Sequence, residues 1–503
     1  MLSQLFDSYA WLLDHWWVFH IFTVASVFIW VLFGRGTFRR SAKFFVYTAL
    51  FSIVVVMIST FFPFIGGKDY FFRVSIDLAL IFYLLWGVFE AKRGELWNEI
   101  KETAQKPLFI AVSAFVLMVL LASIFALDPG AAFWSNFERG EGAFQMLHYW
   151  LFFSFLVVLF KTKEDWRRLF WAAAAAAVLM IFYGVVADLG LGHSFISQYV
   201  GGAPETIWGK LTIGRFQGSL GNPAYTAPYL LFAMFYLVSL WLGDEQRYKA
   251  RKLIYLIPLV LFSFFFLNSQ TRTTLLGFGF GAIVFLVYLI FSLPRLRLWL
   301  GSLLLAAIIL GGMGFYFQQS AFVKSLPGAR VFDISPETSS LNTRFWTWGS
   351  AWRGFLDRPI FGWGPENFSA VFDKYFDPRH FVPGLNTETW FDRAHSAYLD
   401  YLAETGILGL GAYLGIFAVF FMLFFKRSKN DWSEAPAAKK EISFFKSREF
   451  LGSIERGLML ALVAAYMVQN IAIFEVLPMY INLFFFLGFA FYYFYRAPLN
   501  PKP

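Results

Sequence analysis

Long apolar segments recur along this 503-residue chain, and they constrain its fold more than any other feature. A helix needs about 20 apolar residues to cross the hydrocarbon core of a bilayer. Only 15% of the residues are charged, against about a quarter in soluble domains. Thirteen apolar segments can be drawn, near 16–34, 44–64, 74–91, 107–127, 144–160, 169–187, 218–242, 253–268, 274–293, 298–316, 396–425, 455–474 and 477–495. The sequence therefore predicts an all-α polytopic membrane protein of 12 or 13 transmembrane helices.

The basic residues divide unequally between the two alternating sets of connections. One set holds 28 of the 42 Lys and Arg residues and consists of 35–43, 92–106, 161–168, 244–252, 294–297, 426–456 and the C-terminus. Cytoplasmic loops are enriched in Lys and Arg, so this set is expected in the cytoplasm. Thirteen helices would then place the N-terminus outside, and twelve would place it inside. We attribute the formal charge of +9 to this topology and expect no nucleic-acid partner.

Three parts are expected along the chain. Residues 1–316 would hold ten transmembrane helices, and 317–395 would form an extracytoplasmic loop subdomain. Residues 396–503 would hold the last three helices and a basic cytoplasmic loop near 426–455. A connection as long as 317–395 favours a functional lid or small subdomain. Within it, the Trp and Phe spacing of 342–356 predicts an amphipathic interfacial helix.

Several kinds of site are not expected from this sequence. It contains no cysteine, which excludes disulfides, thiol catalysis and thiolate metal ligands. The six histidines are scattered without a ligand spacing, so we expect neither a metal nor another cofactor. The N-terminus is acidic and does not resemble a cleavable signal peptide. No internal repeat is evident, which weakens a transporter interpretation.

Cations are scarce on the predicted outer side, so each one there is a candidate ligand for an anionic group. Arg272 lies in a very short turn, and Arg215 directly precedes the seventh helix. Guanidinium groups bind phosphate through two hydrogen bonds and remain charged at any working pH. The alternative for each is an interfacial anchor or an ion pair. Candidates of second rank are Lys68, Arg73, for which Asp77 is a possible partner, and Arg344.

The segment 386–410, NTETWFDRAHSAYLDYLAETGILGL, places His395 where the eleventh helix begins. A neutral imidazole can take a proton from a sugar or serine hydroxyl; the alternative is a hydrogen-bonded interfacial histidine. Glu404 does not share a face with His395 in an unbroken helix and is expected to brace the loop or pair with an Arg. The glycines of GILGLGAYLG suggest close helix packing. Asn222 is expected to cap the helix that follows it.

Five segments, in this order, resemble the O-antigen ligase and O-antigen polymerase superfamily. Together with the long outer loop they span roughly residues 130 to 415. The sequence departs from the family pattern at Ser396 and Ala224, where Asn is usual, and at Thr273, where Gly is usual. The segments are FERGEGAFQMLHYW, GRFQGSLGNPAYTAPYL, SQTRTTLLG, TRFWTWGSAWRGFLDRPIFGWGPENF and AHSAYLDYLAETGILGL.

The resemblance implies a membrane-embedded glycosyltransferase of the GT-C type. Such an enzyme moves a glycan from a polyprenyl-pyrophosphate carrier to an acceptor hydroxyl at the outer face of the bacterial plasma membrane. It would work without metal or nucleotide sugar and invert the anomeric carbon. The same resemblance implies that His395 activates the acceptor and that Arg215 and Arg272 hold the pyrophosphate. Further candidates for binding pyrophosphate or glycan are Arg73, Lys68, Arg344, Asn222 and Glu404.

The acceptor remains open at this point. The family includes ligases to lipid A-core, polymerases that join O-antigen or exopolysaccharide units, and protein O-oligosaccharyltransferases. An alternative of a different class is a transporter or flippase for lipid-linked glycans. That alternative predicts broken helices and charges at the midplane, whereas this chain concentrates its charges at the outer rim, with Asp77 as a near exception.

Overall fold

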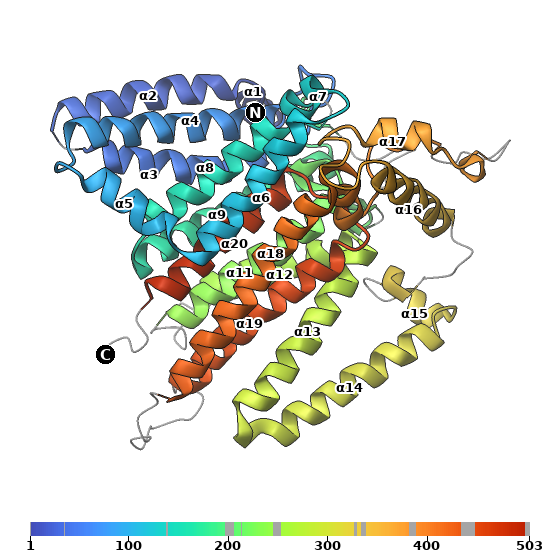
Figure 1. Ribbon diagram of the computed structural model, residues 1–503. Helices are drawn as coiled ribbons and strands as arrows, with labels where there is room; N and C mark the ends of the chain where they lie inside the picture. The colour runs from blue at the N-terminus through green and yellow to red at the C-terminus, as the bar shows by residue number, and fades with distance from the viewer. Residues whose placement is uncertain are drawn as a thin grey trace.

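The computed structural model describes residues 2–34, 36–136, 139–196, 206–212, 214–244, 253–325, 329–332, 339–381, 389–433 and 448–497. Every regular element in these ranges is a helix, which confirms the all-α prediction. Most of the long helices form one bundle, and α16 (Ser339–Asp357) and α17 (Phe368–Lys374) lie together at one end of it (Figure 1).

Nine helices in the described ranges are long and apolar enough to span a membrane. Two helices at the N-terminus, α1 (Leu2–Asp14) and α2 (Trp16–Leu32), pass the same test as a pair but are bent by 74°. The apolar helices α8 (Ala143–Leu159) and α12 (Leu253–Asn268) are shorter. The nine are α4 (Gly66–Phe89), α6 (Pro107–Ile124), α9 (Lys163–Leu189), α11 (Pro223–Gly243), α13 (Arg272–Ser292), α14 (Arg297–Tyr316), α18 (Ala397–Ser433), α19 (Arg448–Gln469) and α20 (Leu477–Tyr495).

The second predicted segment, 44–64, differs from the structure at both ends. Helix α3 (Phe38–Ala49) begins earlier, because the Thr37 side chain caps it by accepting a hydrogen bond from Arg40 N. It tightens into the 3-10 turn η1 (Leu50–Val54) and then stops. The chain next closes a turn through a hydrogen bond from Met57 N to Pro63 O, which removes these residues from a regular helix.

Three of the basic connections meet at one end of the bundle. Arg39 contacts Glu99 at 2.7 Å, Lys161 also pairs with Glu99, and Lys43 contacts Asp165 at 2.7 Å. The connections 35–43, 92–106 and 161–168 therefore lie on the same side, as the alternation predicted. The short helix α5 (Glu95–Ala104) supplies Glu99.

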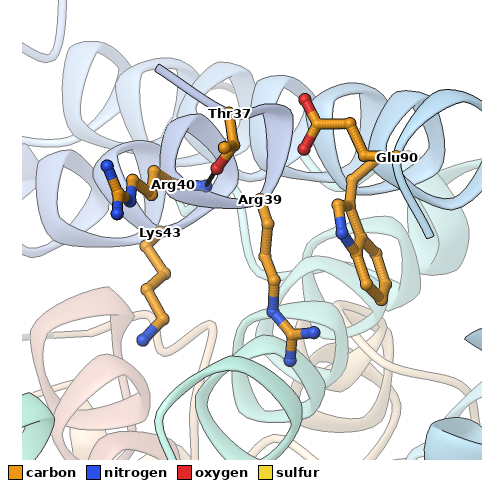
Figure 2. Close-up of a pocket in the computed structure, with 6 residues that line it drawn as sticks. Thr37, Arg39, Arg40, Lys43 and Glu90 are labelled. Carbon is orange, nitrogen blue, oxygen red and sulfur yellow. Dashed lines mark hydrogen bonds between the residues drawn. The ribbon is translucent and has the colours of Figure 1, made fainter. Parts of the chain in front are cut away.

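A hollow at this end is lined by Thr37, Arg39, Arg40, Lys43, Trp86 and Glu90. Figure 2 shows Arg39 and Lys43 extending together from α3, away from the carboxylate of Glu90. The Arg39 guanidinium also lies 4.5 Å from the Trp86 ring. Since these two cations already pair with Glu99 and Asp165, we interpret the hollow as part of the packing between connections.

The interior of the bundle is built around α20, which is buried along nearly its whole length. Its aromatic side chains pack on Trp166 and Phe170 of α9. Two glycines of α13 provide a second kind of packing: a Cβ at Gly277 or Gly281 would lie 2.5 or 2.7 Å from backbone carbonyls of α19. Small residues let membrane helices approach this closely. By contrast, α14 packs on α13 and has no buried residue.

The described parts of the predicted outer loop form a small helical unit with its own apolar core. The predicted helix 342–356 lies within α16 (Ser339–Asp357), and Arg344 sits in the second turn of this helix. Phe372 and Phe391 pack in this core together with Ala403 of α18. The other short elements are α7 (Pro129–Trp134), α10 (Ile207–Thr212), η2 (Gly218–Leu220), η4 (Pro294–Leu296), α15 (Ala321–Ser325), η5 (Ala329–Phe332), α17 (Phe368–Lys374) and η6 (Pro378–His380).

Parts of two predicted loops lie outside the described residues. These are 326–328, 333–338 and 382–388 of the outer loop, and 434–447 of the basic loop near 426–455. The division of the chain at 316 and 395 stays a prediction.

The orientation can be tested with single cysteines, because the native chain has none. Glu102 and Asp373 are exposed at predicted inner and outer positions. In intact cells, an impermeant thiol reagent should label Asp373→Cys and should label Glu102→Cys only after lysis. The opposite pattern would reverse the orientation.

Candidate functional site

The residues before α18 form a strained turn centred on His395, which we call the His395 loop (389–396). His395 has a positive φ of 57°, a conformation that costs a non-glycine residue about 1–3 kcal/mol. Its neighbours are firmly held. Ala394 N donates to Asp400 Oδ1 at 2.6 Å, and Ala394 O accepts from Trp348 Nε1 at 3.0 Å. Ala397 N donates to carbonyls of the α19–α20 connection. The fold thus imposes this turn on His395.

The imidazole of His395 is oriented by one hydrogen bond and two rings. Its Nδ1 lies 3.2 Å from Arg393 O. A carbonyl can only accept, so Nδ1 carries the hydrogen and Nε2 presents a lone pair. The rings of Phe391 and Phe474 meet the imidazole edge-on, with centroids at 5.3 and 5.0 Å. This arrangement fixes which nitrogen can act as a base.

The electrostatic surroundings keep this imidazole neutral. Burial, followed by the positive charge of Arg344, lowers the pKa of His395 to about 4. This value lies well below the ordinary histidine pKa of about 6.5. A ring with this pKa carries no charge at neutral pH and can accept a proton there.

Helix α18 is interrupted by a kink at Gly406. This residue has a φ of 66°, and a Cβ there would lie 2.2 Å from Ile360 O. Residues 359–364 hydrogen-bond along the break, with Ile407 N donating to Pro359 O and Gly364 N donating to Glu404 O. Backbone hydrogen bonds therefore join α18, on both sides of Gly406, to residues 359–364.

Close packing was the wrong interpretation for part of the glycine run. A Cβ at Gly411 or Gly415 would meet nothing within 4 Å, so these glycines do not bring a neighbouring helix close. The requirement for glycine lies at Gly406, where the backbone itself needs the left-handed conformation.

Glu404 pairs with an arginine, as one of the two sequence alternatives predicted. Its Oε1 lies 2.8 Å from Nη1 of Arg393, and Nη2 of Arg393 binds Glu366. The Arg393 side chain is only 7% exposed. Burial opposes its charge, but the two carboxylates outweigh burial and raise the pKa of Arg393. Sequence reasoning missed the pairing of Arg393 with Glu366, because the two residues are 27 positions apart along the chain.

Arg215 and Arg272 are brought together at the turn between α12 and α13. Arg215 Nε donates to Ser269 O at 3.1 Å, and its Nη2 donates to Thr271 Oγ1 at 3.3 Å. Burial, followed by the charges of Arg330 and Arg272, lowers the pKa of Arg215 to about 10. Arg330, on η5, thus joins this arginine group. Sequence reasoning missed it, because nothing distinguishes it from an ordinary exposed arginine in a long loop.

The segment that begins α11 lies between the arginine group and the His395 loop. Asn222 caps the helix by accepting a hydrogen bond from Ala224 N at 2.8 Å, which confirms its predicted structural role. The next residue, Pro223, accepts from Thr271 Oγ1 at 2.9 Å. Tyr225 accepts a hydrogen bond from Arg139, which also binds Asp392 of the His395 loop. One short turn therefore connects both groups.

The cations of second rank divide between two places. Arg344 donates to Ala472 O at 2.9 Å and is a positive neighbour of His395. Lys68 is 2% exposed and donates to Val55 O. Arg73 donates to Gly140 O and Gln145, whereas Asp77, its expected partner, contacts His148. Lys68 and Arg73 thus support the backbone behind the site and are not placed with Arg215.

A small cavity below the His395 loop is rich in carboxylates, including Glu141, Glu366, Asp400, Glu404 and Glu475. Arg393 forms ion pairs with two of them, Glu366 and Glu404. Glu475 accepts hydrogen bonds from Tyr401, Tyr413, Tyr466 and Asn470. Among the described residues, no group of three or more His, Asp or Glu side chains is placed to hold a metal ion.

Residues 257–414 match the protein-family model described as O-Antigen ligase. The match runs from α12 through the predicted outer loop into α18 and includes Arg272, Arg330, Arg344 and His395. Arg215 and Asn222 lie before it. No curated protein matches the chain.

Gly406 and Gly411, on the same helix, allow a matched test of the break. Gly406→Ala should destabilise the protein by about 2 kcal/mol or more, because alanine resists a positive φ and its methyl group meets a carbonyl. Gly411→Ala should be neutral or stabilising by up to about 1 kcal/mol through helix propensity. Thermal unfolding of the detergent-solubilised proteins, followed by loss of monodisperse material, would compare them. Equal midpoints would show that the break does not depend on glycine.

Proposed function

We propose that this chain, a member of the O-antigen ligase superfamily through residues 257–414, transfers a glycan from a polyprenyl-pyrophosphate carrier to an acceptor hydroxyl. The reaction would take place at the outer face of the bacterial plasma membrane. Multiple apolar helices and the family match support a membrane O-antigen ligase-like protein. The donor, the carrier and the mechanism are our proposal.

The observation that carries the proposal is the state of His395. It lies in the family-matched segment, is held in a strained turn, and keeps its lone pair on Nε2. Strain that the surrounding structure imposes is typical of functional positions. A neutral imidazole with a fixed tautomer suits a general base.

The proposed transfer is a single displacement at the anomeric carbon of the donor. Nε2 of His395 takes the proton of the acceptor hydroxyl as its oxygen attacks the anomeric carbon of the donor. The bond between that carbon and the pyrophosphate oxygen breaks, and the leaving pyrophosphate keeps the electron pair. Attack from the face opposite the leaving group inverts the anomeric carbon. No electron acceptor or additional group is needed.

The arginine group would bind the leaving pyrophosphate. Negative charge on that group grows in the transition state, where fixed positive donors stabilise it most. Convergence of like charges around Arg215 also disfavours the empty site electrostatically, so an anion binding there would relieve repulsion. The short turn at Asn222 and Pro223 connects this group to the His395 loop, which supports their acting on one substrate.

Arg272→Ala should lower the transfer rate by on the order of 10²–10³-fold, as expected when one stabilising donor is removed. Arg272→Lys should restore little, because an ammonium cannot form the paired hydrogen bonds of a guanidinium. Arg353→Ala removes an exposed arginine of α16 and should leave the rate unchanged. Purified protein in liposomes with a polyprenyl-pyrophosphate glycan provides the assay. Full activity of Arg272→Lys would contradict the paired contact.

His395→Ala should bind the donor nearly normally but transfer glycan on the order of 10²–10⁴-fold more slowly, because the proton moves only during reaction. Lipid A-core, glycan and protein acceptors should each be offered, since they separate ligase, polymerase and protein transferase. Unchanged turnover of His395→Ala would remove the base. Translocation of donor across the liposome without any transfer would instead support a flippase.

The wild-type enzyme should keep its transfer rate from neutral pH down to about pH 5. The base acts in its unprotonated form, and its pKa is lowered to about 4, so that form persists below the ordinary histidine range. The rate should fall as the pH approaches 4. A fall centred near 6.5 would show that His395 is not the group that titrates, or that its surroundings differ during reaction.

A further inference from the structure

Arg139, on the connection between α7 and α8, makes a two-point ion pair with Asp392. Its Nε and Nη2 donate to the two carboxylate oxygens at 2.6 and 2.9 Å. The two residues are 253 positions apart, and their side chains are only 15% and 17% exposed. A paired bond of this kind fixes direction as well as distance. The connection before α8 is therefore joined rigidly to the His395 loop.

The same guanidinium also lies against the residues that surround the imidazole. Its third nitrogen, Nη1, donates to the Tyr225 hydroxyl at 3.2 Å. Its central carbon lies 5.1 Å from the ring centre of Phe474, and that ring meets the His395 imidazole edge-on at 5.0 Å. Arg139 thus reaches His395 by two routes, through the loop backbone at Asp392 and through the ring of Phe474.

The charges near His395 give this contact an electrostatic consequence. Arg344 on α16 and Arg139 favour the neutral ring, whereas Asp392 favours the protonated ring, and the Arg393 carbonyl accepts from Nδ1. Burial acts to raise the pKa of Asp392, but its hydrogen bond and charge interaction with Arg139 leave it lowered. Asp392 is therefore an anion three residues from the base, and Arg139 is the cation that neutralises it.

We propose that Arg139 is a positioning residue for His395: its pairing with Asp392 and its contact with Phe474 hold the imidazole neutral and in the orientation for proton transfer. Arg139 would not touch the reacting atoms. This inference rests on the proposed role of His395 as base. It gives the FERGEGAF segment, to which sequence analysis assigned no individual residue role, a specific task in the reaction.

The test compares Arg139→Gln, Asp392→Asn and the double variant by their rates of glycan transfer against pH. Arg139→Gln leaves an unpaired carboxylate near the imidazole, so the acidic fall in rate should move to higher pH. Its kcat should drop about 10- to 100-fold, as expected when a reacting group is slightly misplaced, with little change in donor KM. Asp392→Asn should not move the fall upward. The double variant should return it close to the wild-type position, because the unpaired anion is gone.

Two further variants control for folding and for the loss of a surface charge. Arg379→Gln removes another two-point Arg–Asp pair, with Asp377, from the outer part of the chain, and it should leave both kcat and the pH profile unchanged. Arg139→Lys keeps the charge but loses the paired geometry, so it should lower kcat without moving the acidic fall. It also serves as the test if Arg139→Gln does not fold.

An unmoved acidic fall in folded Arg139→Gln would overturn the inference, as would a fall in the double variant that is moved upward as far as in Arg139→Gln. A purely structural role predicts lower yield or stability with an unchanged profile. If His395→Ala loses transfer while Arg139→Gln behaves as wild type, only the positioning role fails. If His395→Ala keeps its turnover, the proposed function fails first.

Discussion

The ion triad of Arg393, Glu366 and Glu404 is the interaction on which the end of the bundle that carries the His395 loop depends. Removing a charge from water costs several kcal/mol, so a guanidinium only 7% exposed is stable here because two carboxylates face it. Those carboxylates come from the loop after α16 and from α18, while Arg393 belongs to the His395 loop. Removing Arg393 would leave two buried carboxylates without their cation. The triad thus fixes three segments to one another before any substrate is bound.

The side chains of the proposed reaction come from separate segments of the chain, and the turn that begins α11 connects them. The base lies on the loop before α18, and the arginine group lies at the turn between α12 and α13 and on η5. The start of α11 contacts both, through Pro223 on one side and Tyr225 on the other. A lid arrangement is not required for this connection, because hydrogen bonds within the described residues already make it. The long connection between α14 and α18 contributes Arg330 and Arg344 to the two groups.

The sequence predicted the parts of this fold that depend on local rules. Lipid imposes a minimum apolar length, so most of the predicted segments coincide with helices, although 44–64 leaves the helix after residue 54, and nine helices in the described residues pass the length test alone. Asn222 was recognisable as a cap because capping involves neighbours two or three residues apart. Partners such as Arg139 and Asp392 could not be identified, because no local pattern records a contact across 253 residues. The positive φ of His395 could not be predicted either, because the surrounding fold imposes that conformation on the residue.

Helix α14 has a different relation to its environment from the rest of the bundle. It spans Arg297–Tyr316, none of its residues is buried, and it stands apart from the bundle beside α13 (Figure 1). Acyl chains, and not side chains of this protein, must therefore fill most of the space around it. Its position and tilt depend on the thickness and composition of the surrounding bilayer, to which helices adjust by tilting. The chain thus carries one element whose geometry the lipid sets, joined directly to the helix that begins with Arg272.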